Sequence, residues 1–169
     1  MIIKILGAGF ILAGCSGLGI SLAASYKKEV AALKDFLNIL DLAECQLQYK
    51  NQCLPDLLKD ISVNKSPVSM FFKTLSEELE SQVQPSVPHC VPIALKKHPN
   101  IPTSTKILIE KFGQTLGSFD INGQLLEIQA IRTEANGIYE QLKEQQSDKI
   151  KNYKTLSVCA GAAIVILFI

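Results

Sequence analysis

The chain has 169 residues, of which 47% are hydrophobic and only 20% are charged, and its mean hydropathy is +0.21. That is apolar for a domain of this length, and the excess lies at the two ends, since residues 5–24 and 155–169 contain no charged side chain. Residues 25–154 carry 16 basic and 16 acidic side chains. This balance argues against nucleic acid as a partner, because phosphate binding needs a concentrated positive field.

The N-terminal run reads "ILGAGFILAGCSGLGISLAA" over residues 5–24, which as a helix spans about 30 Å. Within it, "ILAGCSG" resembles the cleavage signal of a bacterial lipoprotein, with Cys15 as the residue that would be acylated. Apolar sequence continues nine residues beyond Cys15, and Lys4 is the only charge before it. These features favour a membrane-spanning helix over residues 1–24. An outer-surface lipoprotein with a helical domain, lipidated on Cys15, is the alternative.

Small residues recur every four positions in this run, at Gly9, Ala13, Gly17 and Ser21. Such spacing places them on one face of a helix, where a second membrane helix can approach closely. We therefore predict transmembrane packing along this stripe, while noting that membrane helices are rich in glycine in any case.

The first part of the middle region indicates three helices. Residues 27–50 have apolar positions three and four apart, which predicts an amphipathic helix continuous with the N-terminal run. The stretch "LPDLLKDI" predicts a short helix, with Pro55 in its first turn. The stretch "SPVSMFFKTLSEELES" predicts a third, with Ser66 as N-cap and Pro67 at the first helical position. The apolar positions of the first are Val30, Leu33, Leu37, Leu40 and Leu47.

Residues 82–104 contain five of the seven prolines, which predicts loops with one helical turn over "PIALKK". The following "STKILIEKFGQTLG" predicts a helix that ends at Gly117. Asp120 is the expected N-cap of the last helix, which no proline interrupts before the C-terminal run. In "STKILIEKFGQTLG" the residues expected inward are Ile107, Leu108, Phe112 and Leu116. In the helix that follows Asp120 they are Leu125, Ile128, Ile131, Ala135, Ile138 and Leu142.

The C-terminal "TLSVCAGAAIVILFI" (155–169) reaches about 17 residues with Tyr153 and Lys154, near the lower limit for a membrane span. The sequence thus predicts an all-α protein, in which an antiparallel helical bundle (25–154) is flanked by transmembrane segments (1–24 and 155–169). Lysines gather on the bundle side of both segments, which places the bundle in the cytoplasm and both termini outside. They are Lys27, Lys28 and Lys34, then Lys143, Lys149, Lys151 and Lys154.

The middle region offers no evident chemistry. There is no phosphate-binding loop, and His89, Cys90 and His98 lack the paired spacing of a structural zinc site, so we expect no catalytic residue, metal or cofactor. The odd number of cysteines favours reduced thiols. Glu77, Glu78 and Glu80 form an acidic helix face, most simply a solvated one.

Several motifs resemble the stage III sporulation protein AB family of endospore-forming bacteria. They are "MIIKILGAGFIL", "QYKNQCLPDLL" with Tyr49, Leu54 and Pro55, and "KFGQTLGSFDINGQ". The most specific is "LGSFDINGQ", which matches a family pattern at Leu116, Gly117, Asp120 and Gln124. The resemblance covers nearly the whole chain. We expect the motif residues mainly to set a tight reversal between the last two helices.

The family is similar to the cytoplasmic domain of F-type platform proteins of type II secretion and type IV pilus systems. The resemblance implies a non-enzymatic subunit of the channel complex between mother cell and forespore. It implies as partners a cytoplasmic ATPase (the stage III AA protein), other stage III channel subunits and membrane lipids. A polar face including Glu44 or Glu77–Glu80 is the expected docking surface for the ATPase. A tail-anchored enzyme regulator or chaperone-like adaptor is a weaker alternative.

Overall fold

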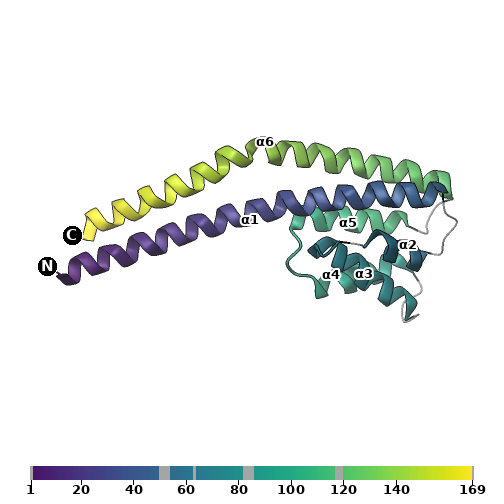
Figure 1. Ribbon diagram of the computed structural model, residues 1–169, viewed down its shortest axis with the longest axis horizontal. Helices are drawn as coiled ribbons and strands as arrows, with labels where there is room; N and C mark the ends of the chain where they lie inside the picture. Colours follow the sequence, from purple (N-terminus) through teal and green to yellow (C-terminus); the bar gives the residue numbers. More distant parts are fainter. Residues whose placement is uncertain (1, 50–53, 63, 82–85, 117–119, 169) are drawn as a thin grey trace. The chain divides into compact units, whose positions relative to one another are not determined.

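The computed structural model describes residues 2–49, 54–62, 64–81, 86–116 and 120–168, except for the side chains of residues 2–6, 8–12, 54, 167 and 168. Within these ranges every regular element is an α-helix, so the predicted all-α class is confirmed. The helices, shown in Figure 1, are α1 (Ile2–Tyr49), α2 (Leu54–Ile61), α3 (Pro67–Glu80), α4 (Val87–Lys97), α5 (Thr103–Thr115) and α6 (Ile121–Phe168).

The chain forms two compact units. The hairpin unit comprises Met1–Lys28 and Gln141–Ile169, and the bundle unit comprises Glu29–Glu140. Both long helices, α1 and α6, run without a break from one unit into the other. Packing therefore divides the chain at Lys28 and Gln141, whereas the apolar runs in the sequence end at residue 24 and begin at residue 155.

Phenylalanine rings from three helices form the centre of the bundle unit. Phe36 of α1, Phe72 of α3 and Phe112 of α5 are fully buried, with ring centroids 5.8–6.4 Å apart. Phe71 adds an edge-on contact to Phe72 at 5.0 Å. Phe36 and Phe72 are stacked, and Phe112 meets both edge to face. Burial of these large apolar surfaces is the main force that holds α1, α3 and α5 together.

The helical periodicity places most of the expected core residues inward. Val30, Leu33 and Leu40 of α1 are buried, whereas Leu37 and Leu47 are half-buried. In α6, Ile128, Ile131 and Ala135 are buried, and Leu125, Ile138 and Leu142 are half-buried. In α5, Leu108, Phe112 and Leu116 are buried as expected. The inward assignment of Ile107 is wrong, since its side chain is 50% exposed and Ile109 is buried instead.

The proline-rich segment is more helical than the sequence predicts. The expected single turn is in fact α4, an 11-residue helix that includes Pro88 and Pro92. Pro88 lies in the first turn, where a missing N–H costs little because first-turn donors have no partner within the helix. The buried residues Val87, Cys90, Val91, Ala94 and Leu95 recur at helical spacing. Their packing against the bundle sustains the helix despite Pro92.

In the hairpin unit, α1 and α6 lie side by side and antiparallel. A Cβ added at Gly19 would lie 2.1 Å from Ser157 Oγ and 2.9 Å from the carbonyl oxygen of Tyr153, so the helices approach closely at this point. Nearer the other end, the Tyr26 hydroxyl donates a 2.9 Å hydrogen bond to the carbonyl oxygen of Leu142, and Lys149 Nζ lies 5.0 Å from the centre of the Tyr26 ring.

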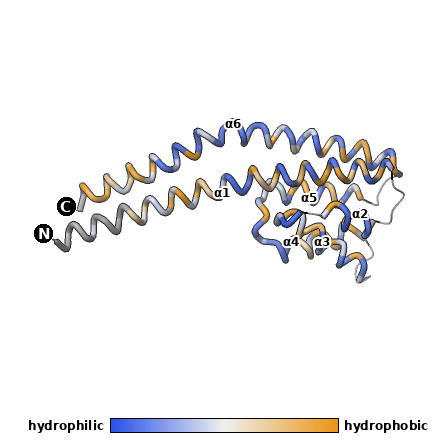
Figure 2. The backbone as a smooth tube through the Cα atoms, viewed as in Figure 1, coloured by the Kyte–Doolittle hydropathy of each residue, from blue (hydrophilic) through white to orange (hydrophobic). Residues whose placement is uncertain are grey.

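Figure 2 shows apolar residues along the C-terminal end of α6 and a mixture of polar and apolar residues in the bundle helices. In the part of the chain that the structure describes, no helix is both long and apolar enough to cross a membrane. Residues 2–6 and 8–12 of the expected N-terminal span have side chains outside that description.

Candidate functional site

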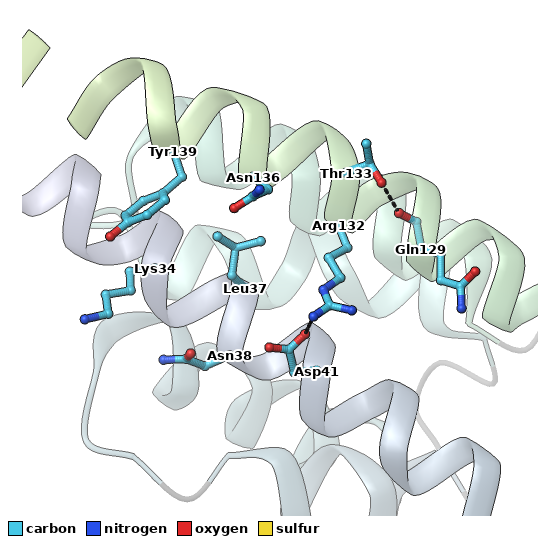
Figure 3. A pocket seen from close by; sticks show the side chains of 9 residues that line it. All are labelled: Lys34, Leu37, Asn38, Asp41, Gln129, Arg132, Thr133, Asn136 and Tyr139. Atoms are coloured by element: carbon cyan, nitrogen blue, oxygen red, sulfur yellow. Dashed lines mark hydrogen bonds and ion pairs between the residues drawn. The ribbon is translucent and has the colours of Figure 1, made fainter. Parts of the chain in front are cut away.

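Polar side chains of α1 and α6 converge on an open groove in the bundle unit (Figure 3). Its volume is about 590 Å³. Four lining residues lie between Lys34 and Asp41 of α1, and the other five lie on successive turns of α6 from Gln129 to Tyr139. The lining residues are Lys34, Leu37, Asn38, Asp41, Gln129, Arg132, Thr133, Asn136 and Tyr139.

Arg132 is the centre of the polar contacts between the groove walls. One guanidinium nitrogen lies 2.8 Å from Asp41 Oδ1, and the other lies 3.4 Å from Glu44 Oε2. Gln129 Nε2 donates a 2.8 Å hydrogen bond to the other oxygen of Glu44. Asp41 and Glu44 are three residues apart on α1, so both face the same side of the helix and Arg132 reaches both.

Glu44, one of the expected docking residues, is bonded to α6 within the bundle unit. Its side chain is only 16% exposed, and both of its oxygens contact α6. Exposed ion pairs contribute roughly 0–1 kcal/mol each. The contacts of Arg132 and Gln129 therefore act mainly by fixing the register of α1 against α6, and they leave Glu44 little capacity for a partner.

The three glutamates of α3 have different environments. Glu78 forms an ion pair with Lys97 of α4 and is 22% exposed, and Glu80 lies 3.4 Å from Lys59 of α2. Glu77 is exposed, and it has no ion pair among the described residues. Glu77 is therefore the member of the predicted acidic face with a carboxylate available to a partner.

The "LGSFDINGQ" motif connects α5 to α6. Leu116 is the buried C-cap residue of α5, and its N–H donates to the carbonyl oxygen of Phe112. Asp120 caps α6, because its Oδ1 accepts a 3.2 Å hydrogen bond from the N–H of Gly123. Gln124, one turn later, is 92% buried. Gly117, the expected stop, lies outside the described residues. The described motif residues thus face the interior or cap a helix, which is a structural role.

The small-residue stripe does not face α6. Ala13, Gly17 and Ser21 are exposed, and a Cβ at Gly17 would meet nothing within 4 Å. Gly9 lies outside the described side chains. Gly19 and Ala23 of α1 are buried, and Gly19 is the position at which a Cβ would meet Ser157 and the Tyr153 carbonyl of α6. Within the hairpin unit, the close contact is therefore two positions away from the predicted stripe.

His89, Cys90 and His98 have separate environments and do not form a common cluster among the described residues. His89 Nδ1 lies 2.6 Å from the Ser86 hydroxyl, and His98 Nε2 lies 2.9 Å from the Thr74 hydroxyl. Burial lowers the pKa of His98, and the nearby Lys97 lowers it further. Burial raises the pKa of the Cys90 thiol, with a smaller contribution from Glu78. The described residues contain no group of three metal-ligating side chains.

Two features of the site were missed in the sequence. The bridge from Arg132 to α1 depends on the register of two helices separated by about 90 residues, which no local pattern encodes. The Gly19 contact had a local signal, because Cys15, Gly19 and Ala23 recur every four residues just as the predicted stripe does. Periodicity alone does not distinguish between the two stripes.

Known proteins resemble this chain over nearly its whole length. The stage III sporulation protein AB family model matches residues 4–169. A relative from Bacillus subtilis (strain 168), stage III sporulation protein AB, is 24% identical over an alignment of 169 positions that covers 98% of each chain. A solved structure of stage III sporulation protein AB (SpoIIIAB) superposes with a TM-score of 0.64 at 21% identity. The superposition covers 72% of this chain and 98% of that one, and it supports the fold. With the family match running almost from end to end, this chain belongs to the stage III sporulation protein AB family.

Proposed function

We propose that this protein is a non-enzymatic membrane platform subunit of the channel complex between mother cell and forespore. In this role the bundle unit faces the mother-cell cytoplasm and holds an ATPase, the stage III AA protein, at the membrane. The apolar ends of α1 and α6 insert into the mother-cell membrane that faces the forespore, so that both termini lie outside. Other stage III channel subunits are the expected neighbours.

The observation that carries this proposal is the continuity of the two long helices. Each is a single helix of 48 residues that contributes to the bundle core, and each contains an uncharged run, residues 5–24 near the start of α1 and residues 155–168 at the end of α6. A helix transmits force or position along its axis because each added turn is hydrogen-bonded to the previous one. Two continuous helices therefore provide a mechanical connection between a docked cytoplasmic protein and the membrane.

The docking surface in this proposal is the acidic face of α3 around Glu77. Glu77 is exposed and has no ion pair among the described residues, whereas Glu44 is bound to α6. The charge of the bundle unit favours a basic partner surface, because residues 29–140 contain fourteen acidic and ten basic side chains. Complementary charge speeds association and selects partners.

Co-purification of the ATPase with the full-length chain in detergent tests the proposal. Glu77→Lys is expected to reduce the recovered ATPase by roughly tenfold, since it places like charges together at the contact. Glu110→Lys is the matched control, because Glu110 is also an exposed helical glutamate, on α5. Equal loss in both variants would exclude the α3 face, and no binding by the unmodified chain would refute the anchoring role.

Labelling with palmitate separates this proposal from the lipoprotein alternative. Helix α1 runs without a break through Cys15, so lipoprotein cleavage before that residue would remove the first part of the helix. The platform role predicts no label that depends on Cys15. Label that disappears in Cys15→Ala would favour an outer-surface lipoprotein instead.

A further inference from the structure

Positive charge is concentrated in the hairpin unit. Residues 1–28 and 141–169 contain seven lysines and only two acidic side chains, whereas the bundle unit has an excess of acidic residues. Counted over residues 25–154, the charges cancel, and the separation becomes visible only when they are divided between the two compact units. The excess positive charge thus belongs to the unit that also contains both apolar ends.

Four of these lysines are exposed and have no ion pair among the described residues: Lys27 and Lys28 of α1, and Lys151 and Lys154 of α6. We call them the lysine cluster. Lys149 differs, because its ammonium group lies over the Tyr26 ring, and Lys143 has an interaction of its own. The two acids of the unit, Glu144 and Asp148, precede Lys151 on α6.

The contacts between the helices define which residues lie at the same level. Gly19 is opposite Tyr153 and Ser157, and Tyr26 is opposite Leu142 and Lys149. Lys154 therefore lies level with Gly19, and Lys151 lies between the levels of Gly19 and Tyr26. Lys27 and Lys28 follow Tyr26 directly, at about 1.5 Å per residue along the helix.

Exposed apolar side chains share this stretch of the hairpin. They are Leu18, Ile20 and Leu22 on α1, and Leu156 and Val158 on α6, with exposed fractions of 49–71%. A basic cluster that directly adjoins apolar side chains fits the boundary between lipid headgroups and acyl chains. There a lysine stem lies along apolar surface while its ammonium group reaches the phosphate layer.

We infer that the lysine cluster binds the phosphate headgroups of anionic phospholipids, an inference that rests on the proposed membrane role of the hairpin unit. Each lysine near an anionic leaflet adds favourable electrostatic energy that a zwitterionic lipid does not supply. The lysines of α6 contribute more to this headgroup contact than those of α1. The reason is that Lys151 and Lys154 lie level with exposed apolar residues of α1, whereas Lys27 and Lys28 lie beyond Tyr26. The protein thereby selects the lipid class around its hairpin and does not merely cross the bilayer.

Native mass spectrometry of the full-length chain, in detergent with equal phosphatidylglycerol and phosphatidylcholine, measures this selection. The unmodified chain is expected to retain phosphatidylglycerol preferentially, and Lys151→Gln/Lys154→Gln to reduce the preference roughly tenfold or more. Lys151→Arg/Lys154→Arg should preserve it, because arginine keeps the charge. Lys65→Gln/Lys73→Gln is the matched control, since it removes two exposed lysines from the bundle unit. Excess inorganic phosphate should not displace the retained lipid.

Alkaline carbonate extraction of cell membranes separates failure of this inference from failure of the proposed function. A chain that resists extraction but shows no preference for phosphatidylglycerol, or keeps its preference in Lys151→Gln/Lys154→Gln, overturns the lipid inference alone. Displacement by inorganic phosphate also overturns it, because the ligand is then a free anion. A chain released by carbonate overturns both proposals.

Discussion

His98 combines a buried ring with a defined hydrogen bond. The Thr74 hydroxyl donates to the carbonyl oxygen of Met70 at 3.1 Å, so it accepts from a proton on His98 Nε2, 2.9 Å away. The ring also makes an edge-on contact with Phe71, with centroids 6.2 Å apart. Burial of this ring and the neighbouring charge of Lys97 both lower the pKa of His98, so the fold favours the uncharged form.

The lowered pKa of His98 predicts a specific pH dependence. The unfolded chain binds the proton more readily than the folded chain, so this group's contribution to the free energy of unfolding is complete above the ordinary pKa of 6.5 and is lost as the pH falls through the folded pKa. Urea unfolding of the full chain in detergent should show a loss of stability between about pH 7.5 and pH 5 that is smaller in His98→Gln. An identical pH profile in that variant would contradict the assignment.

Gly113 allows α4 and α5 to approach closely. A Cβ at this position would lie 2.5 Å from Val91 Cγ2, and the branched valine side chain has little freedom to move away. Gly113→Ala should therefore lower the free energy of unfolding by about 1–3 kcal/mol, despite the better helix propensity of alanine. Val91→Ala combined with Gly113→Ala should recover part of the loss. A steric cause would be contradicted if the double variant lost more free energy of unfolding than the sum of the losses in the two single variants.

At the scale of elements, Gly19 and Gly17 form a matched pair on α1. Both are helical glycines of the hairpin unit, but only Gly19 faces a neighbour, with Ser157 and a backbone carbonyl at contact distance. Gly19→Leu should separate the two helices and clearly lower the thermal unfolding temperature in detergent, whereas Gly17→Leu should leave it almost unchanged. The opposite ranking would mean that the predicted stripe, and not the Gly19 face, holds the hairpin together.

The sequence predicted those elements whose signals are local. Ser66 followed by Pro67 indicated the start of α3, and the structure shows the Ser66 hydroxyl accepting from the N–H of Ser69 at 3.1 Å. Asp120 indicated the start of α6 in the same way. A cap is a contact within one turn, and sequence therefore encodes it directly.

The errors arose where tertiary packing decides between two local solutions. Proline content argued against α4, yet its five buried residues offset the cost of Pro92. Ile107 and Ile109 both flank Leu108, and the close approach at Gly113, four residues after Ile109, selects Ile109 for the interior. The bridge from Arg132 to Asp41 and Glu44 depends likewise on an alignment of α1 and α6 that no short stretch specifies.

At the scale of the whole molecule, two units of opposite charge are built on the same pair of helices. The bundle unit has an acidic excess and an aromatic core, and the hairpin unit has a basic excess and apolar ends. In the proposed role this division gives each unit one partner, a cytoplasmic ATPase for the first and an anionic membrane for the second. Helices α1 and α6 each contribute residues to both units.

The proposed role depends above all on the side of the membrane on which the bundle unit lies, and thiol labelling measures that side. Single-cysteine variants of the full chain, with Lys65→Cys in the bundle unit as the reporter, are exposed to a membrane-impermeant thiol reagent before and after the cells are opened. If the bundle unit faces the cytoplasm as proposed, Lys65→Cys reacts only after opening, because the Lys65 side chain is exposed. Reaction of the same residue on intact cells would contradict it.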